Sequence, residues 1–502
     1  CVSTIAGGKS NTVAGNFSTI GGGCSNIICN SSSIAFIGGG HANRAISTCD
    51  AVVGGSGNTA NGGSSFVGGG VGSNAAGCTS AVVGGQSNSA LCAHSIVGGG
   101  QSNAANGSCS SVTGGRDNKT LGDFSTIGGG IANQSRGDYT SVVGGLSSCA
   151  IGKASFVGGG SCNCVTGLSA FAGGGLVNKV TGAASSIVGG NTNTASGSGA
   201  FVGGGNFNNA ALKESFIGGG AGNANGGACS VIGGGSSNST SGAHSSIVGG
   251  SSNSASGCHS TVGGGITNCV SGTCSVIAGG KANSAGGCET FIGGGNCNET
   301  TISSDAATIA GGVSNKICAN ADHGFIGGGQ SNCIVANACD AVIGGGDTNK
   351  VCGDFSTVGG GCENIASASR SFVGGGESNV ASGAASVRVG GISNTGCGTC
   401  SFIGGGRANT DLGSFSSIVG GCGNTLTGSV TGAFIGGGSA NKTCGKGSFI
   451  GAGLGNSMGC TNSEFGVIVG GVDNCITGLN AVLVGGECNC ALSPCSTVGG
   501  GN

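Results

Sequence analysis

Large and charged side chains are scarce in this chain of 502 residues. It has no tryptophan, one tyrosine and one proline, and charged residues make up 7% of it. A globular core of that length needs more large side chains. Glycine does not recur at every third residue and proline is almost absent, which excludes a collagen triple helix. Disordered chains are rich in charge or proline, whereas this chain has a mean hydropathy of +0.26, so ordinary disorder is disfavoured.

The same scarcity excludes several functions. The charges, 16 basic against 18 acidic residues, are scattered without a basic run, so we expect no nucleic-acid partner. No stretch of eighteen apolar residues exists, and we expect no membrane insertion by this segment. The five histidines are scattered, and no glycine run is followed by the lysine and helix of a phosphate-binding loop. The pair Cys397-Gly-Thr-Cys400 has no second pair beside it. We therefore expect no enzyme activity, no metal and no cofactor.

Glycine, with 122 residues, is abundant and periodic. About 32 near-copies follow the pattern S-x-[IV]-[GVA]-G-G-x-x-N-x-[AVT]-x-G-x-x, and most are 15 residues long. Longer copies are expected at 27–43, 299–349, 425–441 and 457–474. Each copy is aligned on an asparagine after the glycines, and one run of these is Asn58, Asn74 and Asn88.

A short fixed period predicts one turn of a parallel β-solenoid. We expect an all-β fold with 1–502 as one continuous β-roll. The apolar residue six before the asparagine, such as Val157, and the small residue two after it, such as Val165, are expected to point inward. Glycine suits the turns and close approaches. Coils spaced ~4.8 Å apart predict a rod roughly 150 Å long.

The aligned asparagines are expected to stack from coil to coil as a hydrogen-bonded ladder. The alternative is that asparagine merely tolerates a left-handed turn conformation. The central run of this ladder is Asn163, Asn178, Asn193, Asn208, Asn223, Asn238 and Asn253.

Phenylalanine recurs seven residues before the asparagine, next to an inward Val or Ile. Neighbouring strand residues point to opposite faces, so these rings are expected to face outward. A repeated exposed apolar surface predicts an interface between rods. The alternative is that the rings lie under a coil edge or turn. The residues are Phe36, Phe156, Phe171, Phe201, Phe216, Phe291, Phe325, Phe372, Phe402, Phe434 and Phe449.

The segment SVIGGGSSNSTSGAHSSIVGG (230–250) shows a wider likeness. Its pattern resembles the head repeats of trimeric autotransporter adhesins of the Yersinia adhesin and haemagglutinin type, and the resemblance covers essentially the whole chain. It implies a left-handed β-roll of three chains and a role in host attachment. The heads of that family are nearer 14 residues per repeat and are usually free of cysteine. A similar glycine-rich trimeric viral fibre fits the cysteines of this chain better.

Thirty cysteines favour an oxidising location, either extracellular, on a cell surface or on a virion surface. Cysteines at the same place in adjacent coils lie within disulfide range. We expect staples joining Cys78 to Cys92, Cys149 to Cys164 and Cys475 to Cys490. Crosslinks between chains and free thiols are the alternatives.

The three longer coils between Asn298 and Asn349 place their extra residues in one turn. We expect a ridge there that carries local binding specificity, since loops on a rigid scaffold carry recognition. Its residues are Asp305, Asp322, His323 and Asp340.

Together these features predict a fibrous surface protein, a spacer or adhesin that projects and attaches, with copies of itself and a host or cell-surface receptor as the expected partners. A structural filament subunit without receptor binding is one alternative, and an ice-binding solenoid is another. The chain begins at Cys1 and ends within a repeat at Asn502, so we expect a segment of a longer protein.

Overall fold

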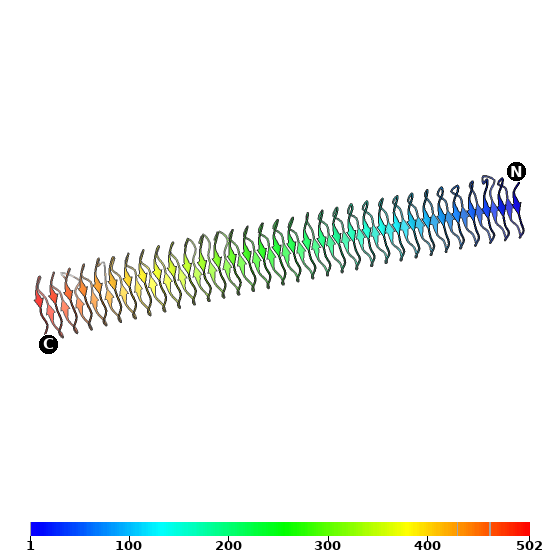
Figure 1. Ribbon diagram of the computed structural model, residues 1–502. Helices are drawn as coiled ribbons and strands as arrows, with labels where there is room; N and C mark the ends of the chain where they lie inside the picture. Colours follow the sequence, from blue (N-terminus) through cyan, green and yellow to red (C-terminus); the bar gives the residue numbers. More distant parts are fainter. Residues whose placement is uncertain (1, 429, 461–462, 502) are drawn as a thin grey trace. The chain divides into compact units, whose positions relative to one another are not determined.

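The computed structural model describes residues 2–428, 430–460 and 463–501. These residues form 65 two-residue β-strands and no helix. They divide into two compact units, one ending at His244 and one beginning at Ser245. Figure 1 shows strands of successive coils repeating through each unit. The predicted all-β parallel solenoid, with about 15 residues per turn, is confirmed; its coils number about 33.

The first unit holds β1 (Thr4–Ile5) to β32 (Ser239–Thr240). Each coil contributes one odd-numbered and one even-numbered strand, and each strand pairs in parallel with its equivalent in the next coil. For example, β21 (Phe156–Val157) pairs with β23 (Phe171–Ala172), and β20 (Cys149–Ala150) pairs with β22 (Cys164–Val165). The odd strands thus form one wall of the coil and the even strands form the other.

The second unit holds β33 (Ser246–Ile247) to β65 (Thr497–Val498) and repeats this arrangement. Longer coils keep the strand register and place the extra residues in turns. In this unit Glu299 pairs with Lys316, Thr425 with Lys442, and Ser457 with Cys475. In the first unit Ile27 pairs with Arg44 in the same way. These insertions coincide with the predicted longer copies.

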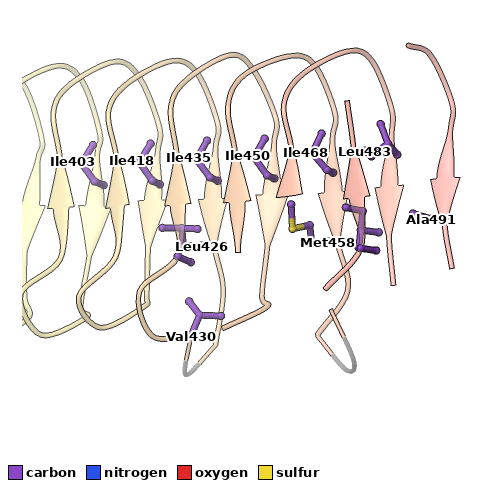
Figure 2. Packing of buried hydrophobic residues seen from close by; sticks show 13 residues of the cluster. Ile403, Ile418, Leu426, Val430, Ile435, Ile450, Met458, Ile468, Leu483 and Ala491 are labelled. Atoms are coloured by element: carbon purple, nitrogen blue, oxygen red, sulfur yellow. The ribbon is translucent and has the colours of Figure 1, made fainter. Parts of the chain in front are cut away.

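The core consists of the second residue of each strand, as the sequence predicts. Val157 and Val165 are fully buried, as are their equivalents in almost every coil. Figure 2 shows the two rows in the second unit, with Ile403 and Ile418 in the row from the odd strands and Leu426 in the row from the even strands. The interior is narrow, because each coil closes over one branched residue and one residue that is usually small.

Close approach of successive coils dictates two of the glycine positions. Gly160, the third glycine of its run, has a φ of 82°, and a Cβ there would lie 2.1 Å from the carbonyl oxygen of Gly175. Gly167, in the opposite turn, has no positive φ. A Cβ there would still lie 2.0 Å from the carbonyl oxygen of Gly182. Neither position has room for a side chain in its present backbone conformation. The column of Gly167 nevertheless holds Cys92 and Leu212 in other coils, whereas that of Gly160 is glycine throughout.

The asparagine column is buried and bonds each coil to its neighbours. The backbone N–H of Asn178 donates to Oδ1 of Asn163 at 2.9 Å. Nδ2 of Asn163 donates to the carbonyl oxygens of Gly159 in its own coil, at 2.8 Å, and of Gly175 in the next coil, at 3.0 Å. The ladder runs mainly from side chain to backbone. Direct amide-to-amide bonds occur in some coils only, for example from Asn223 to Asn208 at 3.1 Å.

One assignment in this column was wrong by one residue. Ser73, not Asn74, occupies the aligned position, because Ser73 is buried and its N–H bonds to Oδ1 of Asn58 at 2.9 Å. Asn74 is the outward residue of β10 (Asn74–Ala75). Ser73 and Asn74 are adjacent in the sequence, and only the strand register shows which of them lies in the column.

Three linked exceptions interrupt the apolar core of the second unit. Arg388 replaces the inward Val or Ile of β51 (Val387–Arg388) and is fully buried. Gly396 stands opposite it, and a Cβ there would overlap the guanidinium. Asp411 follows in the next coil and is also fully buried. Burial lowers the pKa of Arg388 to about 10 and raises the pKa of Asp411, while the charge of each partner partly offsets the shift in the other.

Replacing Asn178 with alanine should loosen its coil. The loss leaves the N–H of Asn193 and the carbonyl oxygens of Gly174 and Gly190 without their side-chain partner, a cost of about 2 to 4 kcal/mol. We expect faster hydrogen exchange at the Asn193 amide. Asn178→Ser should have a smaller effect, since Ser148 occupies this column naturally and accepts from Asn163 at 3.4 Å. Unchanged exchange in the alanine variant would contradict the ladder.

Restoring the prevailing core residues at all three exceptional positions should preserve or raise stability. Arg388 Nε and Asp411 Oδ2 have no hydrogen-bond partner among the described residues, and an apolar replacement of a buried charge pair often stabilises by about 1 to 4 kcal/mol. Asp411→Ala by itself should destabilise by about 3 kcal/mol or more, since it leaves a buried charge uncompensated. Urea unfolding measures the free energy of unfolding of R388V/G396A/D411A and of D411A, each relative to the unsubstituted chain. A triple variant less stable than D411A is the contrary result.

Candidate functional site: an outward apolar stripe

An apolar stripe follows the outward residues of the odd strands in each unit. We define it as the first residue of each odd strand together with the residue directly after that strand. Twelve of its residues are phenylalanines, eight of them 37–43% exposed and four half-buried. The eleven predicted rings all face outward, and their role in an interface stays a prediction. Phe66, which has the same S-F-V-G-G-G context, was missed.

Rings in adjacent coils stack on one another. The ring centroids of Phe156 and Phe171 lie 5.3 Å apart, with 3° between the ring planes. The pair Phe434 and Phe449 has a separation of 5.2 Å. The stacking follows from the coil spacing, which brings equivalent side chains within ring contact.

Each phenylalanine of the stripe is followed, two residues later, by glycine. A Cβ on that glycine would lie 3.3–3.6 Å from Cε1 of the ring in all twelve coils. In the coil of Phe201, for instance, the distance from Gly203 is 3.5 Å. The ring therefore lies along the glycine backbone. A Cβ there would lie closer still, at 2.2–2.4 Å, to a carbonyl oxygen of the next coil, so a side chain would clash with that backbone as well as crowd the ring.

Coils without phenylalanine often carry valine at that same position. Nine such valines follow an Ala, Ser or Val at the outward strand position, and their side chains are 48–63% exposed. In the coil between Phe171 and Phe201, for example, Ser186 is outward and Val188 is 51% exposed. The stripe thus keeps apolar bulk from either of two positions. The valines are Val53, Val83, Val143, Val188, Val248, Val389, Val419, Val469 and Val484.

The stripe has weaker stretches in the first unit. In one of them Ser111, Thr126 and Ser141 are outward and line, together with Val143, a shallow hollow of about 400 Å³ that ends at Phe156. Other large outward side chains sit in the turn before these strands. The rings of Phe124 and Tyr139 stack there at 5.0 Å.

The acidic residues of the expected ridge act mainly within the turn. Oδ1 of Asp305 accepts the backbone N–H of Cys288 at 2.8 Å, and Oδ1 of Asp322 accepts that of Asp305 at 2.9 Å. His323 and Asp340 form an exposed pair with 3.3 Å between Nδ1 and Oδ1. The carboxylates of Asp305 and Asp322 thus cap backbone donors between coils. Binding by this ridge stays a prediction.

The cysteines are paired differently from the prediction. All six cysteines of the predicted staples are free thiols. Cys78 and Cys92 are out of register, because that pairing depended on aligning Asn74. A disulfide joins Cys444 to Cys460, which lie in adjacent coils with Cα atoms 4.6 Å apart. Sequence alignment did not reveal this pair, since the two cysteines differ by one position and the second lies in an enlarged coil.

Comparison with family profiles and with curated proteins identifies no relative. No protein-family profile matches the chain, and a search of curated proteins returned no significant match. Where the structure is described, no helix is long and apolar enough to cross a membrane. No group of three or more His, Cys, Asp or Glu side chains in those ranges could hold a metal ion.

An outward phenylalanine and the residue two positions after it should be energetically coupled. Ser186→Phe places a ring over Val188, where it is crowded, whereas S186F/V188G lets the ring stack between Phe171 and Phe201. We expect the single variant to be destabilised and the double variant to recover by about 1 kcal/mol relative to additivity. A double-mutant cycle with V188G, followed by urea unfolding, measures this term. Additive effects would show that ring and glycine are independent.

Proposed function

We propose that this chain is a fibrous, non-catalytic protein whose repeated coils provide length and whose copies associate along the apolar stripe. In this proposal it is a rod-like spacer or adhesin outside the cell or on a virion. The observation that carries it is the stripe itself, which recurs through both units with phenylalanine or valine as the large residue.

A second copy of the chain is the partner that best matches this surface. The stripe repeats once per coil, at about 4.8 Å. A second solenoid has the same repeat, so its side chains meet equivalent sites along the whole contact. A compact globular partner has no such period and covers only a few coils.

The apolar area of the stripe approaches that of a stable contact. Six phenylalanines in each unit, four of them about two-fifths exposed and two half-buried, present on the order of 500 Å² per unit. The valines add to this area. A standard interface needs about 800 Å² per partner. Three chains around one axis is the arrangement that the adhesin resemblance implies, and we propose it here.

Attachment and an oxidising location belong to the same proposal. Thirty cysteines, most of them at outward positions, suit a surface outside reducing compartments. The outward residues of the even strands mix Thr, Lys, Cys and Asn, as in Thr194, Lys179 and Asn209. Such a mixture gives little support to ice binding, for which a regular hydroxyl face is expected.

The native mass under reducing and non-reducing conditions tests the proposal. We expect light scattering to give the mass of three chains in both. Phe201→Lys with Phe216→Lys places charge in the stripe and should yield single chains. The matched control, Thr194→Lys with Asn209→Lys, alters the opposite wall and should remain trimeric.

Three outcomes separate the possibilities. A wild-type monomer would reject self-association along the stripe. Equal dissociation of both double variants would place the contact elsewhere. An open-ended filament would favour the structural-polymer alternative. Circular dichroism of each variant shows whether it is folded.

A further inference from the structure

Two free thiols face each other on the even-strand wall of the first unit. The even strands of four successive coils place Gln134, Cys149, Cys164 and Lys179 directly beside one another in register. The Sγ atoms of Cys149 and Cys164 are 2.9 Å apart, and the Cys149 thiol donates to Cys164. Both side chains are half-buried. This arrangement is a vicinal dithiol held by the backbone ladder.

Positive charge flanks this dithiol. Lys179 follows Cys164 in the column, and Arg136 lies in the turn after β18 (Gln134–Ser135). The hydrogen bond from Cys149, together with Lys179 and Arg136, lowers the pKa of Cys164 to about 6, against the opposing effect of burial. The same hydrogen bond and burial raise the pKa of Cys149. Cys164 is thus the thiolate of the pair and Cys149 holds the proton.

A hollow lies beside this site and reaches Cys149. It measures about 360 Å³, and its lining includes Gln134, Arg136, Cys149 and Ile151. Arg136 Nε donates to Oε1 of Gln134 at 2.7 Å, which places the guanidinium on the hollow's lining. A small molecule with carboxylates can therefore meet Arg136 beside Cys149, whose Sγ is in contact with that of Cys164.

We infer that Cys149 and Cys164 form a thiol–disulfide exchange site for small anionic disulfides. The Cys164 thiolate attacks one sulfur of the substrate disulfide, forming a mixed disulfide and releasing one thiolate. That thiolate takes the proton of Cys149. Cys149 then attacks Sγ of Cys164, which forms the Cys149–Cys164 disulfide and releases the second thiolate, protonated from water. The protein dithiol is oxidised and the substrate disulfide is reduced to two thiols.

The chain contains a matched control pair. Cys475 and Cys490 also face each other in register at the outward position of even strands. Their column continues to Ser457, not to a cation. Burial and the neighbouring Cys475 raise the pKa of Cys490. Any difference in reactivity between the two pairs therefore reflects the surroundings of Cys164 and not the pairing itself.

The test reacts the full chain, reduced and desalted without oxygen, with oxidised glutathione across a range of pH. Fragment mapping by mass spectrometry follows each cysteine. At pH 5.5 we expect Cys164 to react about tenfold or more faster than Cys490, and its rate to level off above about pH 7, because a thiol with a pKa of about 6 is almost fully ionised there. Cys149→Ser should stop at a mixed disulfide on Cys164.

Substitution of the cations separates reactivity from folding. R136Q/K179Q should move the inflection of the Cys164 rate to higher pH while leaving the Cys490 rate unchanged. The inference is overturned if the Cys164 rate keeps rising beyond pH 8 as that of Cys490 does. It is also overturned if the pair is a permanent disulfide that mild reductant does not open. Neither result bears on association along the stripe, which the native mass tests separately.

Discussion

Hydrogen bonding between successive coils is the constraint on which the rest of this structure depends. Each coil must present its backbone groups to the next, as when the N–H of Phe156 donates to Ala170 O at 2.9 Å and that of Gly158 to Ala172 O at 2.8 Å. A turn of about 15 residues that meets this demand encloses little volume. The core accepts a branched residue opposite a small one, and all 18 phenylalanines, each a described residue, lie at outward positions. A narrow core and an apolar exterior therefore share one cause.

The exceptions show how strict the internal volume is. Arg388 enters the core only where Gly396 removes the opposing side chain and Asp411 supplies a compensating charge in the next coil. One large residue thus requires changes at two other positions. The asparagine column is equally demanding, since its side chains satisfy backbone donors and acceptors in adjacent coils. Serine enters that column at Ser73 and Ser148, where it is buried and makes fewer bonds than asparagine: Ser148 Oγ accepts one N–H and Ser73 Oγ has no partner among the described residues.

The repeat of about 15 residues in the sequence was sufficient to predict the coils, the inward residues and the outward direction of the phenylalanine rings. These features follow from repetition and from the alternation of side chains along a strand. Details that depend on register within one coil were harder. Asn74 lies beside the true aligned residue, Ser73, and that single shift also misplaced the pairing of Cys78 with Cys92. The Cys444–Cys460 disulfide joins unequal positions across an enlarged coil. The capping role of Asp305 depends on a backbone donor of the preceding coil, which no sequence pattern displays.

The exchange between phenylalanine and valine is the strongest sign that the stripe is used. Lack of room for a Cβ, mainly against a carbonyl oxygen of the next coil and also beside the ring, accounts for the glycine two residues after a phenylalanine, as at Gly203 after Phe201. It does not explain why many coils without a ring expose a valine at that second position, as Val188 does at 51%. A surface that stays in contact with water gains no stability from an exposed valine, since apolar groups in water carry a free-energy cost. A covered surface does gain, because even apolar bulk along the stripe leaves fewer voids against a partner.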